Sequence, residues 1–123
     1  MTDAARPIRV SAVSLDCDDH AALATFYAEL LGGSLLWSHD HASAVDVAGL
    51  VLVPQSVADY SEPTWPSASI VHLDLTAAAE DLDALTDRAL SLGARLADPQ
   101  PDPRWRVLLD PAGHPFCITP FAP

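Results

Sequence analysis

The stretch SIVHLDL, residues 69–75, repeats the pattern of an earlier stretch, AVSLDC, residues 12–17, and this repetition decides the fold. In both stretches apolar and polar residues alternate, which is typical of a β-strand with one buried face. The two aspartates, Asp16 and Asp74, are 58 residues apart. The chain therefore contains two copies of a unit that begins with a strand.

A helical pattern follows each strand and ends at glycine. Asp18 or Asp19 can cap the first helix, predicted near residues 19–31, whose apolar stripe consists of Leu23, Phe26, Tyr27, Leu30 and Leu31. The second helix is predicted near residues 80–92, with Leu82, Leu85, Ala89 and Leu92 on one face. Each helix is predicted to end at a similar glycine motif, LGGSL in the first half and LGARL in the second. Their first glycines, Gly32 and Gly93, are 61 residues apart.

Three further strands are expected after each helix. In the first half, the strand at 9–17 and its helix are followed by predicted strands at 34–39, 42–47 and 50–55. In the second half, the predicted strands are LGARL, 104–110 and 115–119, and a type I turn over Asp110–Gly113 joins the last two. A linker with Pro63 and Pro66 separates the halves. We therefore predict one α+β domain over residues 1–123, with half one at about 8–56, the linker at 57–69 and half two at 70–120. Its two βαβββ modules form curved, antiparallel-rich sheets around a cavity.

The composition limits the function classes. The chain has 123 residues, half of them apolar, and its six arginines and 17 acidic residues give a net charge of −11. Such a charge repels nucleic acid. No apolar run is long enough to span a bilayer, and no secretory signal is visible at the start, so we expect a cytoplasmic protein with neither a membrane nor a nucleic-acid partner. Cys17 and Cys117 have neither zinc-knuckle nor disulfide-framework spacing and lie in apolar runs.

Strand alternation places a polar strip on the sheet face opposite each helix. Leu73 and Leu75 should pack under their helix, which sends His72 and Asp74 to the other face, and Asp16 repeats this arrangement in the first half. Burying charge on a closed sheet face is costly, so we infer a cleft that both strips line. His72 and Asp74 then act either as a base or polar anchor for a ligand, with Asp16 facing them, or as a buried polar cluster needed for folding.

Aromatic residues in the loops are candidates for the walls of that cleft. Tyr60, Trp65 and Trp105 could line its mouth, since small-molecule sites combine aromatic walls with few polar anchors. The alternative is that they pack the linker against the sheet edge. Arg104 and Arg106 alternate with Trp105 and should face away from it, and we expect them to pair with the surplus carboxylates.

The combined motifs resemble the glyoxalase and bleomycin-resistance proteins of the vicinal oxygen chelate superfamily. The resemblance runs from about Arg9 to Thr119 and rests on Phe26-Tyr27 with Leu31-Gly32, Val71-His72-Leu73-Asp74, Leu92-Gly93-Ala94, Pro63-Thr64-Trp65-Pro66 and the stretch from Asp110 to Cys117, DPAGHPFC. It implies a glyoxalase-like domain. Metal-dependent members hold a divalent ion with side chains from the first and last strands of each half.

The ligand positions that this resemblance implies are mostly occupied by other residues. His72 fits one of them, but its first-half counterpart is Ala12 or Ser14, the last-strand glutamate falls on Cys117, and the last strand of the first half offers only Gln55. A chelated ion needs several converging ligands. We therefore expect no cofactor and no catalytic metal; a divalent metal at His72 is the alternative.

Three functions remain open for the chain. The first is a metal-independent small-molecule-binding protein, similar to the drug-sequestering members of the family. The second is a metal-dependent lyase, isomerase or dioxygenase that uses His72. The third is an interaction module with a vestigial pocket. A homodimer is expected as well, because two copies can complete each other's sheet edges.

Overall fold

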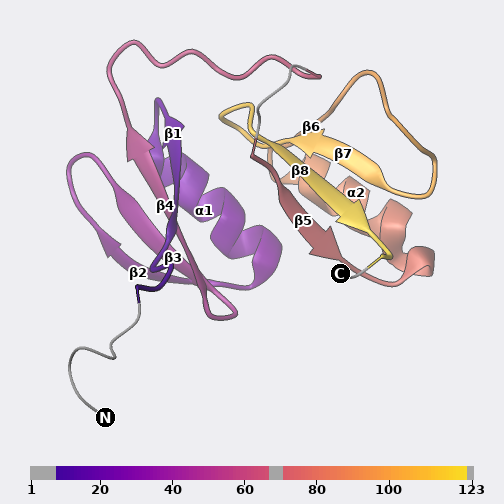
Figure 1. The fold of residues 1–123 in the computed structure, drawn as a ribbon, viewed down its shortest axis with the longest axis horizontal. Coiled ribbons are helices and arrows are strands. Elements are labelled where there is room, and N and C mark those ends of the chain that lie inside the picture. Colours follow the sequence, from indigo (N-terminus) through magenta and orange to yellow (C-terminus); the bar gives the residue numbers. More distant parts are fainter. Residues whose placement is uncertain (1–7, 67–70, 122–123) are drawn as a thin grey trace.

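The computed structural model describes residues 8–66 and 71–121, which fold into two copies of one βαβββ unit (Figure 1). The first unit consists of β1 (Val13–Cys17), α1 (His20–Leu31), β2 (Ser34–Ser38), β3 (Ser43–Val47) and β4 (Leu50–Ser56). The second consists of β5 (Leu73–Thr76), the short 3-10 helix η2 (Ala79–Asp81), α2 (Leu82–Ser91), β6 (Arg95–Leu96), β7 (Arg106–Leu109) and β8 (Pro115–Thr119). No helix of the described residues is both long and apolar enough to cross a membrane.

The two sheets have the same topology. Their strand orders are β1-β4-β3-β2 and β5-β8-β7-β6, so the first and last strands of each unit are neighbours. These neighbours, β1 with β4 and β5 with β8, run parallel, while the remaining pairs are antiparallel. The α+β class and the duplicated βαβββ architecture are thus confirmed.

Several strands are shorter than the sequence pattern predicts; β2 and β3 lose one residue each, β7 covers Arg106–Leu109 instead of 104–110, and β1 and β6 lose the largest share of their predicted length. β1 begins at Val13 rather than at residue 9, because its pairing with β4 starts at Val13 opposite Leu52 and earlier residues have no partner strand there. β6 is reduced to two residues, which pair with Leu109 and Leu108 of β7. The predicted start of the second half, at residue 70, lies outside the described residues.

Helix α1 joins the two halves, and Figure 1 shows it between the first sheet and the second unit. Asp19 caps its start by accepting a hydrogen bond from the amide of Ala22, and Gly32 ends it in the left-handed conformation, with φ of 64°. Two rings of its apolar stripe, Phe26 and Tyr27, lie 5.9 and 6.3 Å from the ring of Phe116 on β8. The hydrophobic core therefore contains residues of both halves.

A buried hydrogen bond lies beside these rings. The hydroxyl of Tyr27 donates to Oδ2 of Asp110 at 2.6 Å, and the Asp110 side chain is fully buried. The other carboxylate oxygen accepts from the amides of Ala112 and His114, while Gly113 completes the predicted turn with a bond from its amide to the Asp110 carbonyl. Burial raises the pKa of Asp110, and burial together with the Asp110 charge raises the pKa of Tyr27.

Further contacts from the same turn hold the first half. The hydroxyl of Tyr60 donates to the carbonyl of Ala112 at 2.6 Å, and Nε2 of His114 lies 2.6 Å from the carbonyl oxygen of Asp16. The ring of His114 thus joins the turn before β8 to β1. The loop between β7 and β8 therefore contributes polar contacts between the halves, and Arg88 of α2 adds another by donating to the carbonyl of Glu29 on α1.

We predict that Tyr27→Phe lowers the free energy of unfolding by about 1–3 kcal/mol, because a buried carboxylate loses a hydrogen-bond donor. Loss of the donor raises the pKa of Asp110 further, so the destabilisation should be largest at neutral pH and shrink as pH falls and the carboxyl becomes protonated. Urea unfolding at several pH values measures both effects. Thr86→Val, which removes a buried side-chain bond to the neutral carbonyl of Leu82, is the matched control and should show no such pH dependence.

Candidate ligand-binding site

A cavity of about 440 Å³ opens on the face of the second sheet that points away from α2 and the core. Its floor follows from strand register: Asp74 of β5 lies opposite Cys117 of β8, and Cys117 lies opposite Val107 of β7. Residues of this parity point away from the helix, which places Thr119 beside them. The full lining is Trp65, His72, Asp74, Pro101, Trp105, Val107, Cys117, Thr119 and Phe121.

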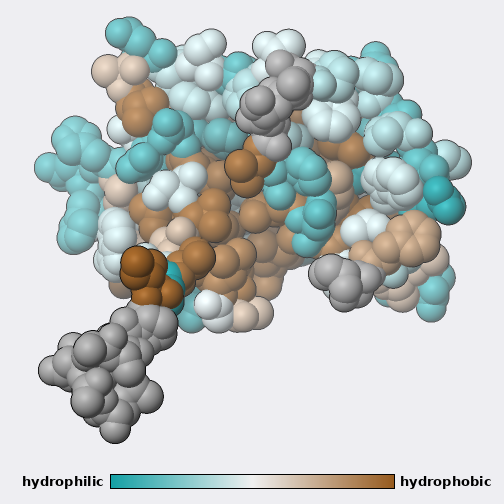
Figure 2. Space-filling model, viewed as in Figure 1, coloured by the Kyte–Doolittle hydropathy of each residue, from teal (hydrophilic) through white to brown (hydrophobic). Residues whose placement is uncertain are grey.

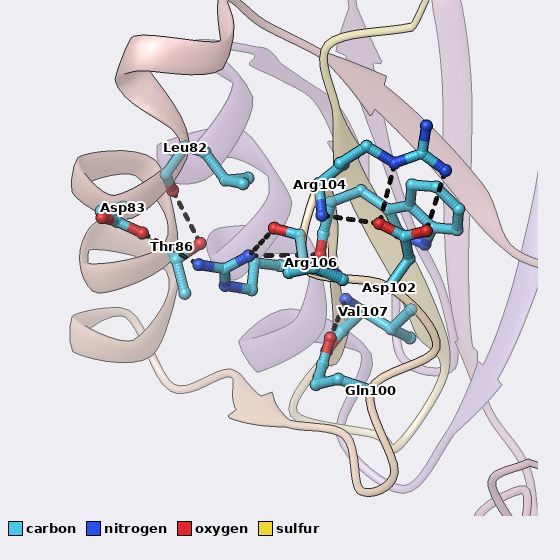
Figure 3. A network of polar contacts seen from close by, with 10 residues as sticks. Leu82, Asp83, Thr86, Gln100, Asp102, Arg104, Arg106 and Val107 are labelled. Atoms are coloured by element: carbon cyan, nitrogen blue, oxygen red, sulfur yellow. Dashed lines mark hydrogen bonds and ion pairs between the residues drawn. The ribbon is translucent and has the colours of Figure 1, made fainter.

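The walls come from loops that hydrogen bonds hold in place. The side chain of Gln100 donates to the carbonyls of Ala97 and Val107, which fastens the loop between β6 and β7. It also accepts from the amide of Val107 (Figure 3). This loop carries Trp105. From the linker, the indole nitrogen of Trp65 donates to the carbonyl of Pro99 at 3.0 Å. Hydrogen bonds within the protein therefore position the residues of the cavity wall.

The two arginines flanking Trp105 are paired with acids, as the sequence predicts. Arg104 contacts Asp102 through two of its nitrogens, and Arg106 contacts Asp83 of α2 at 3.0 Å (Figure 3). The expectation that both face away from Trp105 is wrong for Arg104, whose guanidinium lies 5.5 Å from the Trp105 ring centroid. Strand alternation does not apply there, because β7 begins only at residue 106.

Three functional groups meet on the cavity floor. Nδ1 of His72 lies 3.0 Å from Oδ1 of Asp74 and 4.0 Å from Sγ of Cys117. Burial and the neighbouring Asp74 raise the pKa of the Cys117 thiol to about 11. Cys117 is therefore a protonated thiol at neutral pH, and the same imidazole nitrogen faces both partners, so the group does not form a relay that activates a nucleophile.

The same three groups are candidate ligands for a metal ion. One donor atom of each lies within 4.8 Å of the others, whereas the sequence argument counted His72 alone. Asp74 is part of this donor group because its side chain lies on the same strand face as His72. A thiolate with an imidazole and a carboxylate suits zinc better than manganese, which prefers oxygen ligands. Such an ion would have to displace the proton of a thiol whose pKa is raised to about 11.

The first-half candidates lie elsewhere. Gln55 donates to Asp16 at 2.8 Å, and the two are register partners on β4 and β1, where the second half has Cys117 and Asp74. They and Ser14 belong to the open face of the first sheet and not to the cavity lining. The expectation that Asp16 faces His72 across one cleft is therefore not met within a single chain.

Of the aromatic candidates, Trp65 and Trp105 line the cavity and Tyr60 does not. Tyr60 packs against the core. Sequence reasoning missed Val107 and Thr119, although both could have been found, since they share the face of Cys117 by register and by alternation. Pro101 and Phe121 lie outside any strand, and no periodic signal marks them.

The sequence model of the glyoxalase-like domain matches residues 12–119, which include both units and the cavity. The chain belongs to this family. It thereby falls in the vicinal oxygen chelate superfamily that the motifs indicate. No curated protein sequence matches the chain.

Solved structures share the fold at low sequence identity. A mutant of the fosfomycin resistance protein FosX from Listeria monocytogenes, complexed with Mn(II) and 1S,2S-dihydroxypropylphosphonic acid, has a TM-score of 0.72 at 16% identity, over 95% of this chain and 93% of that one. FosX from Mesorhizobium loti gives 0.72 at 12% identity, with 95% and 94% covered. A glyoxalase/bleomycin resistance protein/dioxygenase family enzyme from Burkholderia phytofirmans gives 0.68 at 22%, with 88% and 94% covered.

We predict that Cys117 reacts slowly with iodoacetamide at pH 8 and that Asp74→Asn accelerates the reaction. A thiol with a pKa of about 11 contains roughly a hundredfold less thiolate than one near 9. Removing the Asp74 charge lowers that pKa, so the alkylation rate should rise roughly threefold or more and its pH profile should shift to lower pH. Mass spectrometry after timed quenching measures the rate. Cys17, which is fully buried, is the internal control, and a wild-type rate equal to that of a free thiol would contradict the prediction.

Proposed function

We propose that the protein binds a small organic molecule in the cavity beside His72 and does so without a catalytic metal. The observation that supports this is the cavity itself, a space of about 440 Å³ with aromatic walls and the polar groups His72, Asp74, Cys117 and Thr119. Small-molecule sites are typically of this size and composition. The proposal includes a single domain over residues 1–123 and a cytoplasmic location, which suits two free thiols.

A metal-dependent lyase, isomerase or dioxygenase is the second candidate. It is favoured by the three donors around His72 and by the Mn(II) bound to the FosX mutant of the same fold. Against it stands the thiol of Cys117 in the position where the family resemblance implies a glutamate. A third candidate, an interaction module with a vestigial pocket, is disfavoured because hydrogen bonds keep the walls of the cavity in place.

Metal content separates the first two candidates. We expect the purified protein to contain no stoichiometric manganese, iron, nickel or zinc, and a chelator to leave its melting temperature unchanged, because no folding energy is linked to an ion. Elemental analysis by mass spectrometry is the measurement. About one ion per chain, lost in His72→Ala, would favour the enzyme. Without a metal, His72→Ala should alter small-molecule binding and leave the unfolding free energy nearly unchanged.

We also propose that two copies associate. An apolar groove runs between the end of α1 and β5, where Leu31 and Leu75 line two adjoining hollows of about 230 and 240 Å³ and Leu73 lines the first of them. Figure 2 shows apolar residues gathered over the middle of this face, with polar residues around them. A contiguous apolar patch rimmed by polar residues is typical of an interface between proteins.

Sedimentation velocity at micromolar concentration should therefore show a homodimer. Leu50→Glu places a charge at the rim of the groove, where Leu50 is 39% exposed, and should shift the protein toward the monomer. Leu96→Glu is the matched control, because Leu96 is 50% exposed on the edge strand β6. A wild-type monomer contradicts the proposal, and so does a Leu50→Glu variant that remains as dimeric as the control.

A further inference from the structure

The cavity combines aromatic rings with a carboxylate. Trp65, Trp105 and Phe121 line its walls, and Asp74 lies on its floor with 61% of its side chain exposed. The face of an aromatic ring is electron-rich and attracts positive charge. We propose that the ligand of this cavity is an organic cation, a quaternary ammonium or similarly charged nitrogen group attached to an apolar body. This inference rests on the proposed function and specifies its ligand class.

The protein already holds one organic cation against two of these rings. The guanidinium of Arg104 lies 5.5 Å from the ring centroids of both Trp105 and Phe121, which are themselves 6.3 Å apart at a steep angle. Arg104 is held by Asp102 and is not part of the cavity lining. The ring pair is therefore arranged so that a planar cation rests on it, and its surface toward the cavity offers the same electrostatics to a ligand.

The charges around the cavity favour the same sign of ligand. His72 occupies Oδ1 of Asp74, which leaves the second carboxylate oxygen for a ligand. Among the described lining residues there is no arginine, and the nearby Arg104 charge is offset by Asp102. The net charge of −11 adds a long-range field that draws cations to the protein and repels anions. A phosphonate or carboxylate ligand would meet Asp74 without a compensating positive group from an arginine in the lining.

Three soluble probes of similar shape test the inference: benzyltrimethylammonium, benzyl alcohol and benzylphosphonate. Trp65 and Trp105 report binding through their fluorescence, and isothermal titration gives the affinities. The ammonium probe should bind about tenfold tighter than the alcohol, as expected for a cation on aromatic faces beside a carboxylate. The phosphonate should bind more weakly than the alcohol.

Two substitutions should act in opposite directions. Asp74→Asn should weaken the ammonium probe by about tenfold and leave benzyl alcohol unchanged, because only the charge is removed. Arg104→Gln should strengthen the ammonium probe, since it removes a competing cation from the ring pair and frees the Asp102 charge. Asp87→Asn, on the exposed face of α2, makes the same change in net charge away from the cavity and should have no effect.

The outcomes separate this inference from the proposed function. If benzyl alcohol binds as tightly as the ammonium probe, or if the phosphonate binds tightest, the cation inference is overturned while small-molecule binding stands. If Asp87→Asn weakens the ammonium probe as much as Asp74→Asn does, net charge alone explains the preference and the assignment to Asp74 is wrong. If none of the three probes binds at millimolar concentration, the result counts against both proposals.

Discussion

The hydrogen bond from Tyr27 to Asp110 is the constraint on which the arrangement of the two halves depends. A fully buried carboxylate is costly unless its oxygens are satisfied, and here one accepts from α1 while the other accepts from its own turn. The bond thereby fixes the turn before β8 against the helix of the other half. β8 carries Phe116 into the core and Cys117 to the cavity floor. The bond from Tyr27 to Asp110 therefore positions both the core packing of Phe116 and the cavity floor at Cys117.

A comparison of the two halves shows which segments build the cavity on the open face of the second sheet. Asp16 and Gln55 occupy the register positions that Asp74 and Cys117 occupy in the second half. The difference lies in the loops: residues 39–42 connect β2 to β3, whereas residues 97–105 connect β6 to β7. The longer connection supplies Pro101 and Trp105, and the linker supplies Trp65. Equivalent strands thus carry a site only where long loops build walls above them.

Most of the fold was accessible from the sequence, because a repeated strand, helix and glycine pattern allows few architectures. The floor of the site was accessible for the same reason, since alternation alone separates His72 and Asp74 from Leu73 and Leu75. The walls were not. The position of the Arg104 guanidinium over the Trp105 ring depends on a loop conformation, to which strand alternation does not apply. The contact between His114 and β1 joins residues that are 98 positions apart, so no local pattern indicates it. Convergence of His72, Asp74 and Cys117 likewise required the parallel register of β5 and β8, which no local pattern encodes.

Cys117 lies at the position where the family resemblance implies a glutamate, and the two side chains differ in the chemistry they bring to the cavity floor. A carboxylate at the end of the last strand would add a hard oxygen donor and a second negative charge beside Asp74. A thiol with a pKa of about 11 adds neither at neutral pH, so the floor keeps one carboxylate and becomes more apolar. Similarity to FosX at this level of identity concerns the fold, and the chemistry of a site depends on its own side chains. The proposed binding of a ligand without its activation therefore rests on the side chains of this floor, where His72 and Asp74 lie beside a protonated thiol.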